Sequence, residues 1–161
     1  MDYESKLKKF ILDNSIQAEH IHFEKSVHTV EEACAEANAG QDDIVKSICL
    51  VGGNQTIAAL VLGSQRASTK RVAEALGISR PDQDNGKAVI RLATPQEILQ
   101  RTGYILGGTP PFGYPATFLI DPTVMEKDIV YAGGGTPNAI IRISVKEIHK
   151  INRGKVVRIR K

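Results

Sequence analysis

The stretch that decides the fold of this chain is VKSICLVGGNQTIAALVL, residues 45–62. Two runs rich in β-branched residues, 45–51 and 56–62, flank the turn composition Gly52-Gly53-Asn54-Gln55. Glycine and asparagine between two such runs are typical of a tight turn between antiparallel strands. The stretch therefore predicts a β-hairpin, with Lys46 just inside its first strand.

Two helices and a strand are expected before the hairpin. Apolar residues recur at helical spacing through the charged segment 2–13, which indicates an amphipathic helix. Residues 18–23 alternate as a strand does. Thr29 and Glu32 then form the pattern of a capping box, which predicts a helix through about Asn38 that ends near Gly40.

Behind the hairpin, helices and strands continue to alternate. Residues 68–76 indicate a helix that ends at Gly77, because glycine suits a left-handed C-terminal cap. A polar connection leads to a strand at 88–92. Thr94-Pro95-Gln96-Glu97 combines a second capping box with proline at the first helical position, and this helix is expected to stop at Gly103.

The last third of the chain is rich in strands. Residues 117–121 and 129–132 are expected as strands on either side of a turn-rich segment, 122–128, and residues 139–143 as a third strand. Ser144 opens a capped helix, and 156–159 are expected as a closing strand. The sequence thus predicts one α/β (α+β) domain over residues 1–161, with a mixed, largely antiparallel sheet flanked by helices.

Composition limits the function classes. With 161 residues, 42% of them hydrophobic and 24% charged, the chain is long enough for one compact core. The net charge of +3 is far below what nonspecific binding to phosphates needs, so a nucleic-acid partner would be held locally. Cys34 and Cys49 are expected as buried free thiols in a reducing cytoplasm. No signal-like segment or membrane-length apolar run is found, which disfavours secretion and membrane insertion.

Two glycine clusters are the most informative features for function. The first cluster is Gly107-Gly108-Thr109-Pro110-Pro111-Phe112-Gly113. Its glycines have no side chains that would cover the backbone N–H groups, and its two prolines make it stiff. Gly133-Gly134-Gly135-Thr136-Pro137-Asn138 follows an apolar segment. Stiff glycine loops beside buried strands often hold ligands, so the two clusters predict a site walled by main chain.

Common catalytic motifs are absent from the sequence. Gly86-Lys87 is not a phosphate-binding loop, because Pro81 stands where that motif needs its first glycine, and a turn is the better interpretation. The second glycine cluster has Asn138 in the third glycine place of the dinucleotide fingerprint. No serine is flanked by glycines as a nucleophile elbow requires, and the histidines show no pattern of a catalytic triad.

Several polar residues have a plain and a functional interpretation. His20 and His22 share one strand face and could hold a metal, but no third ligand stands at a recognisable spacing, so surface histidines are favoured. His28 is either a residue that contacts the site or an ordinary loop residue. Lys46 is a solvated strand residue unless it faces a pocket, where it would supply a point charge. The basic C-terminal residues favour a solvated strand face over an RNA contact; they are Arg153, Lys155, Arg158, Arg160 and Lys161.

An ordered series of segments resembles the YbaK-type aminoacyl-tRNA deacylases, which are related to the editing domain of bacterial prolyl-tRNA synthetases. The likeness runs from about His28 to Ile148. It is carried by Val27-His28-Thr29-Val30-Glu31-Glu32-Ala33, Val45-Lys46-Ser47, Ser68-Thr69-Lys70-Arg71-Val72, Leu92-Ala93-Thr94-Pro95, Thr102-Gly103-Tyr104, Gly107 to Gly113, Phe118-Leu119-Ile120-Asp121 and Ala132 to Gly135.

The resemblance implies a trans-acting editing enzyme of translation. Such an enzyme hydrolyses the ester between a wrong amino acid and the terminal adenosine of a tRNA, free in the cytoplasm, with no metal or cofactor. Its partners would be the acceptor end of an aminoacyl-tRNA and an aminoacyl-tRNA synthetase, with no membrane. The substrate would carry a small amino acid such as alanine, cysteine or serine.

The resemblance also assigns residues to the site. Lys46 matches the family's functionally required lysine, and Gly107 to Pro111 match its Gly-x-x-x-Pro loop beside the aminoacyl pocket. Gly133, Gly134 and Gly135 match a second glycine loop near the same pocket. His28 and Thr29 correspond to the pocket entrance. The resemblance places Asp121 at the end of a central strand, where it would make a polar contact. It implies no role for Tyr114.

An activated ester explains why the chain shows no nucleophile, base or metal motif. The neighbouring ribose hydroxyl can position or activate a water or attack by itself, so the protein must mainly orient the ester and stabilise an oxyanion. Backbone amides of the glycine loops and Lys46 are expected to do so. The alternative is a noncatalytic module that binds a tRNA 3′ end or a nucleotide beside a synthetase.

Overall fold

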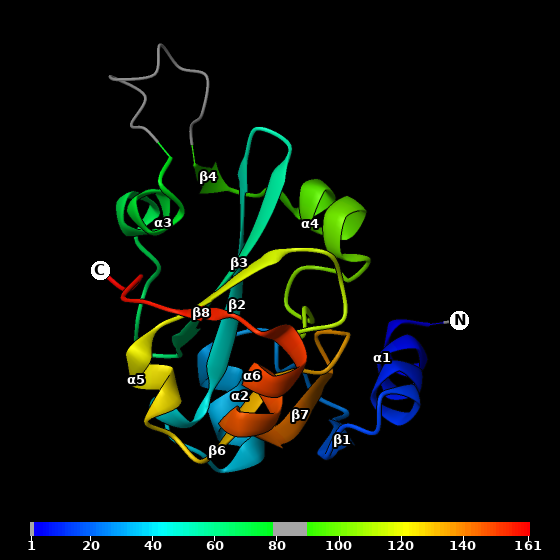
Figure 1. Ribbon diagram of the computed structural model, residues 1–161. Coiled ribbons are helices and arrows are strands. Elements are labelled where there is room, and N and C mark those ends of the chain that lie inside the picture. The colour runs from blue at the N-terminus through cyan, green and yellow to red at the C-terminus, as the bar shows by residue number, and fades with distance from the viewer. Residues whose placement is uncertain (1, 79–89) are drawn as a thin grey trace.

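The computed structural model describes residues 2–78 and 90–161, and its centre is the hairpin expected from the sequence. Strand β2 (Val45–Gly52) pairs antiparallel with β3 (Gln55–Leu62), in register from Val45 opposite Leu62 to Gly52 opposite Gln55. The turn has two residues, and Gly53 adopts the positive φ of 59° that such a turn favours. The prediction of a hairpin is confirmed, and Figure 1 shows it running through the middle of the molecule.

The described strands form two sheets. The larger has the order β4-β2-β3-β5-β8, and the smaller the order β1-β7-β6. The pairings of β5 with β3 and with β8 are parallel, and the other four are antiparallel. The expected class, α/β with mixed and largely antiparallel pairing, is confirmed. Besides β2 and β3, the strands are β1 (Ala18–His22), β4 (Arg91–Leu92), β5 (Thr117–Ile120), β6 (Ile129–Gly133), β7 (Ala139–Ser144) and β8 (Lys155–Val156).

The sequence predicted one sheet, whereas hydrogen bonding divides the strands into two. Among the described residues, one isolated parallel bridge, between Ile44 and Tyr131, joins them just before β2 begins. Past that bridge, β2 and β6 are not paired in the described part of the chain. These unpaired edges matter for function, because they leave room between the two strands.

Several helix ends carry the local signals expected from the sequence. Both capping boxes are present, Thr29 with Glu32 and Thr94 with Glu97, and Gly77 and Gly103 end their helices in the left-handed conformation. The helices are α1 (Tyr3–Asp13), α2 (Val30–Ala37), α3 (Thr69–Leu76), α4 (Pro95–Thr102), α5 (Pro122–Met125), α6 (Val145–Asn152) and a 3-10 turn, η1 (Gln41–Asp43).

Three local expectations need correction. Helix α2 ends at Ala37, close to the expected Asn38, but its left-handed cap is Asn38 rather than a residue near Gly40. The segment 122–128, expected as turns, contains α5, which Asp121 caps through the N–H of Thr123. The expected strands 88–92 and 156–159 are short, as β4 and β8. Residues 88 and 89 and the turn at Gly86-Lys87 lie outside the described residues.

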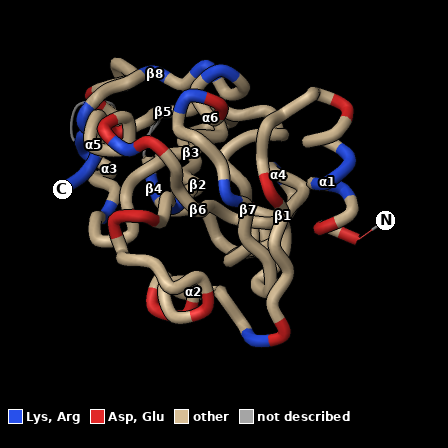
Figure 2. The backbone as a smooth tube through the Cα atoms, turned by 90° about the horizontal axis from the view of Figure 1, so that it is seen from below, with Lys and Arg blue, Asp and Glu red and all other residues tan. Residues whose placement is uncertain are grey.

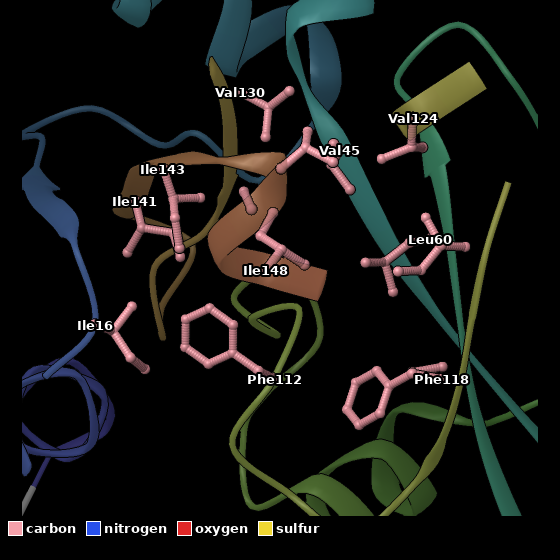
Figure 3. Close-up of a cluster of buried hydrophobic side chains, with 14 of the residues drawn as sticks. Ile16, Val45, Leu60, Phe112, Phe118, Val124, Val130, Ile141, Ile143 and Ile148 are labelled. Carbon is pink, nitrogen blue, oxygen red and sulfur yellow. The ribbon is translucent and has the colours of Figure 1, made fainter. Parts of the chain in front are cut away.

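The main hydrophobic core fills the space between the two sheets. Figure 3 shows Leu60 and Phe118 of the larger sheet facing the group formed by Ile141, Ile143 and Ile148, with Phe112 beside them. A second cluster lies on the other face of the hairpin under α3 and contains Leu50, Ile57, Val61, Val72, Leu119 and Ile159. Helices α1 and α3 lie on opposite sides of the molecule (Figure 1).

Charge is unevenly distributed along the backbone. Lys and Arg gather around β8, α6 and the C-terminal end, whereas the charged residues of α2 are all Glu (Figure 2). Among the described residues, no helix has the length and apolar character needed to span a bilayer.

Candidate functional site

The candidate site is a cavity of about 330 Å³ between the separated edges of β2 and β6. Within the described residues, β2 pairs with β4 at Leu50 and Val51, and the edge of β2 from Val45 to Cys49 lines this cavity. The other walls come from 27–30 with α2, from 106–109, and from 131–133 of β6. Segments far apart in the sequence therefore meet around one hollow of the size that suits a small ligand.

Lys46 lines this cavity. Its Nζ donates to the backbone carbonyl of Gln65. Burial lowers the pKa of the Lys46 ammonium, the charge of Arg66 lowers it further, and Glu31 opposes the shift. An ammonium group carries three N–H donors, so Lys46 can keep its contact to Gln65 and still donate to a ligand.

The first glycine loop, residues 107–113, divides into two halves. Gly107 and Thr109 line the cavity. Within residues 2–78 and 90–161, neither of their backbone N–H groups has a hydrogen-bond acceptor. Gly107 has a φ of 88°, and the His28 ring lies against the position that a side chain would occupy. These two amides are available to a ligand.

The other half of the loop belongs to the core. Pro110, Pro111 and Phe112 are buried, and the Phe112 ring stacks on Phe10 of α1 at 5.8 Å between centroids. Tyr114 Oη donates to the Pro110 carbonyl at 2.7 Å, and Asn152 Nδ2 donates to the Pro111 carbonyl at 3.0 Å. This half anchors the loop rather than lining the cavity.

The second glycine loop, residues 133–136, supports the first. Gly133 lines the cavity, whereas Gly134 and Gly135 do not. Gly135 N–H donates to the Gly108 carbonyl at 2.8 Å, and Gly134 N–H donates to the Ala139 carbonyl at 3.1 Å. A Cβ on Gly133 would collide with the Thr109 carbonyl. The two loops therefore touch backbone to backbone, and only glycine permits this approach.

His28 and Thr29 lie at the mouth of the cavity, and both are exposed. Thr29 caps α2 through the Glu32 N–H, so the start of this helix is fixed beside the mouth. Just before them in the chain, Val27 N–H donates to the carbonyl of Pro137, which follows the second glycine loop, at 2.6 Å. This hydrogen bond connects the entrance of the cavity to the second loop.

Asp121 is not brought to the cavity. Its carboxylate is fully buried and accepts hydrogen bonds from Thr123, from the Ile159 N–H and from Arg160, whose guanidinium lies at 2.8 Å. Burial alone would raise the pKa of Asp121, but these hydrogen bonds lower it by more. The geometry gives Asp121 the task of holding the C-terminal segment and offers no support for a substrate contact.

The remaining predicted polar residues have structural contacts. His20 Nε2 bonds the Gly134 carbonyl at 2.8 Å, and His22 Nδ1 lies 3.0 Å from the Glu4 carboxylate. His20 is therefore not a surface residue, as its side chain is 7% exposed. Cys34 and Cys49 are both free, and Cys49 is buried. No cluster of three or more His, Cys, Asp or Glu suited to a metal occurs in the described part of the chain.

Sequence reasoning missed several residues that line the cavity. Ser47 and Cys49 share the Lys46 strand, Leu92 and Leu106 lie near the mouth and are exposed, and Tyr131 belongs to β6. Ser47 Oγ is buried without a hydrogen-bond partner among the described residues. Leu106 could have been found as the neighbour of Gly107, but nothing local marks Tyr131, which reaches the cavity only because the two sheets diverge.

Comparison with protein families gives one match. A model of a family described as an aminoacyl-tRNA editing domain matches residues 24–151. Helix α1 and strand β1 lie before the matched span.

Two curated relatives align with parts of this chain. An uncharacterized protein of Bacillus subtilis (strain 168), YwhH, is 28% identical over 138 residues, which cover 83% of this chain and 81% of that protein. A proline–tRNA ligase of Solidesulfovibrio magneticus is 31% identical over 86 residues, which cover 53% of this chain but 14% of the ligase.

Solved structures share the fold over nearly the whole length. The crystal structure of hypothetical protein APE2540 superposes with a TM-score of 0.84 at 24% identity and covers 97% of this chain and 99% of its own. A crystal structure described as a candidate trans-editing enzyme for prolyl tRNA synthetase gives a TM-score of 0.84 at 25% identity, over 100% of this chain and 99% of its own.

Proposed function

Because this chain belongs to the aminoacyl-tRNA editing domain family, we propose that it is a trans-acting deacylase that hydrolyses the ester of a mischarged aminoacyl-tRNA. The observation that carries the proposal is the meeting of Lys46, Gly107, Thr109 and Gly133 around one cavity. The likeness to a segment of a proline–tRNA ligase supports the acceptor end of a tRNA as the ligand, handled in the cytoplasm with or beside a synthetase.

The reaction needs a stabilised oxyanion more than a strong nucleophile. A water molecule, positioned and activated by the neighbouring ribose hydroxyl, attacks the carbonyl carbon of the ester. The carbonyl oxygen becomes negative, the bond from the carbonyl carbon to the ribose oxygen breaks, and that ribose oxygen takes up the proton that the water gives up. Donors aimed at the oxyanion each contribute about 3 kcal/mol, or on the order of a hundredfold in rate.

The donors available at this cavity are the Gly107 and Thr109 amides and the Lys46 ammonium. The two amides have no acceptor among the described residues, in contrast to those of Gly108, Gly134 and Gly135, which donate within the protein. A stiff loop holds its amides in place before the substrate arrives, so no reorganisation is needed during the reaction. We assign stabilisation of the oxyanion to these amides together with the Lys46 ammonium, whose charge also orients the ester.

The walls of the cavity suit a small amino acid. Val45, Ile44 and Ile140 contribute apolar surface, and the volume of about 330 Å³ must also admit part of the ribose. A methylene more or less in such a pocket discriminates by about 1–3 kcal/mol, so the wall selects by size only moderately. Alanine, cysteine and serine are the amino acids we propose as substrates.

The experiment that tests the proposal is single-turnover deacylation against a panel of tRNAs charged with alanine, cysteine or serine. We expect release of amino acid from at least one, and Lys46→Ala should lower that rate by about a hundredfold, the usual effect of losing one such donor. Lys150→Ala is the matched control, because the Lys150 side chain is 74% exposed on α6. An unchanged rate in Lys46→Ala would refute the assignment of Lys46. Binding of the charged tRNAs without release would favour the noncatalytic module.

A further inference from the structure

Helix α1 lies against both glycine loops, on the side away from the cavity. Phe10 packs on Gly113 and stacks on Phe112 of the first loop. Lys6 Nζ donates to the Gly103 carbonyl at 3.1 Å, just before that loop. Tyr3 contacts Gly135 of the second loop so closely that a Cβ there would lie 2.8 Å from the Tyr3 carbonyl oxygen. The helix therefore bridges two segments that meet at the cavity.

Glu4 makes the polar part of this contact. Its Oε2 accepts the hydroxyl hydrogen of Thr136 at 2.8 Å, and the hydroxyl oxygen in turn accepts the Asn138 N–H at 3.2 Å. A threonine hydroxyl has one hydrogen to donate, so its bond to Glu4 turns the oxygen's lone pairs toward the Asn138 N–H. Glu4 thereby fixes the turn that closes the second loop.

The surroundings of Glu4 keep it charged and in place. His22 Nδ1 lies 3.0 Å from the carboxylate, and the partly buried His20, whose Nε2 bonds Gly134, lies 3.9 Å away. The Glu4 side chain is 16% exposed. Burial raises the pKa of Glu4, but the hydrogen bonds from Thr136 and His22 lower it by more. Three groups of the second loop and β1 thus converge on one carboxylate.

The contact continues from the second loop to the cavity. Gly135 N–H donates to the Gly108 carbonyl, and Gly108 is the residue between the two whose amides are free. We propose that Glu4 is a positioning residue: it holds Thr136, this fixes Gly135 against Gly108, and the Gly107 and Thr109 amides are thereby kept at the cavity wall. The role in catalysis rests on the proposed deacylase function, whereas the positioning of the loops does not.

The contact of Glu4 with Thr136 can be removed without displacing helix α1. The docking rests on Leu7, which is fully buried in the main core, and on Phe10. Glu4→Ala keeps both, so the helix should stay in place while the Thr136 hydroxyl is released. Glu4→Gln retains an oxygen that can accept from Thr136. Asp13→Ala is the matched control, because Asp13 is an acidic residue of the same helix whose ion pair with Lys9 is exposed.

The test combines amide hydrogen exchange with deacylation. In Glu4→Ala, exchange at the Gly135 N–H should become about tenfold faster, as expected for the loss of one charge-assisted hydrogen bond. The single-turnover rate at saturating tRNA should fall by a similar factor, with little change in the tRNA concentration that gives half the maximal rate. Glu4→Gln should stay within about twofold of the wild type in both measurements, and Asp13→Ala should change neither. Thr136→Val should reproduce Glu4→Ala, and the double variant should lose nothing further.

Several outcomes would overturn the proposal. Unchanged exchange at Gly135 in Glu4→Ala would show that Glu4 does not hold the loop. Faster exchange with an unchanged deacylation rate would remove its role in the reaction. Equal damage by Gln and Ala would assign the effect to charge near the histidines rather than to Thr136. If the wild-type protein releases no amino acid, the proposed function fails, while faster exchange at Gly135 in Glu4→Ala still supports the positioning of the loops.

Discussion

The two glycine loops have similar composition and opposite tasks. In the first loop, Gly107 and Thr109 keep their N–H groups free at the cavity, and the loop holds its shape through residues buried behind it. In the second loop, the N–H groups of Gly134 and Gly135 donate hydrogen bonds to backbone carbonyls of the protein itself.

The structural reason for glycine also differs from one position to another. Gly107, Gly113 and Gly135 have positive φ, whereas Gly108 and Gly133 lie too close to the backbone of the other loop to carry a Cβ, so each loop contains glycines of both kinds. The comparison teaches that one loop presents amides and the other supports it. A glycine-rich sequence by itself does not distinguish these two tasks.

Removing the anchor of the first loop should have the largest effect. Phe112 is fully buried in the main core, where Figure 3 shows it near Ile148. Phe112→Ala should lower the free energy of unfolding by about 3–5 kcal/mol, because it removes buried apolar surface and leaves a cavity. Urea unfolding measures this loss. Leu12→Ala is the control and should cost about 0.5 kcal/mol or less, because the Leu12 side chain is 78% exposed. Equal costs at the two positions would mean that the first loop is not anchored by its aromatic residue.

Placing a side chain between the two loops should have the second-largest effect. Gly133→Ala places a Cβ against the Thr109 carbonyl, and neither backbone can yield without moving the other loop. We expect a loss of about 3 kcal/mol in the free energy of unfolding, at the upper end of the usual cost of overpacking. Gly40→Ala is the matched control, because Gly40 has an ordinary φ of −87° and a Cβ there would meet only Asp43 Oδ2 at 3.4 Å. If Gly133→Ala were as stable as Gly40→Ala, the second loop would not support the first.

The local parts of the fold could be predicted from the sequence. The hairpin turn, both capping boxes and the glycine caps at Gly77 and Gly103 depend on residues within a few positions of one another, and the structure has all of them. The helix α5 was missed because Pro122 was interpreted as part of a turn, although Asp121 and Pro122 are also a helix cap and a first helical residue.

The site could be predicted only in outline. Lys46 and parts of both glycine loops line one cavity, but the sequence does not show that 110–113 point into the core or that Asp121 pairs with Arg160, 39 residues away. The division into two sheets, which creates the cavity, depends on the long-range pairing of β1 with β7, which joins Ala18 to Ile143. Such pairing leaves no local pattern in the chain, so Tyr131 and the tasks of the two loops needed the structure.

The smallest expected effect concerns the bond that closes the first loop. Tyr114 Oη donates to the buried Pro110 carbonyl at 2.7 Å, and burial raises the pKa of this phenol. Tyr114→Phe keeps the ring contacts but leaves that carbonyl without a donor, so the free energy of unfolding should fall by about 1–2 kcal/mol. Urea unfolding and hydrogen exchange across 107–113 measure the result.

Tyr104→Phe is the matched control, because the two rings are neighbours, 6.4 Å apart, and in the described part of the chain the Tyr104 hydroxyl bonds no protein group. It should change stability by less than about 0.5 kcal/mol. If Tyr114→Phe loosened the second loop as much as the first, the two loops would be one cooperative unit, and the division between a presenting and a supporting loop would fail. If it loosened only the first, the amides at Gly107 and Thr109 depend on this bond, and the deacylation rate should fall with it.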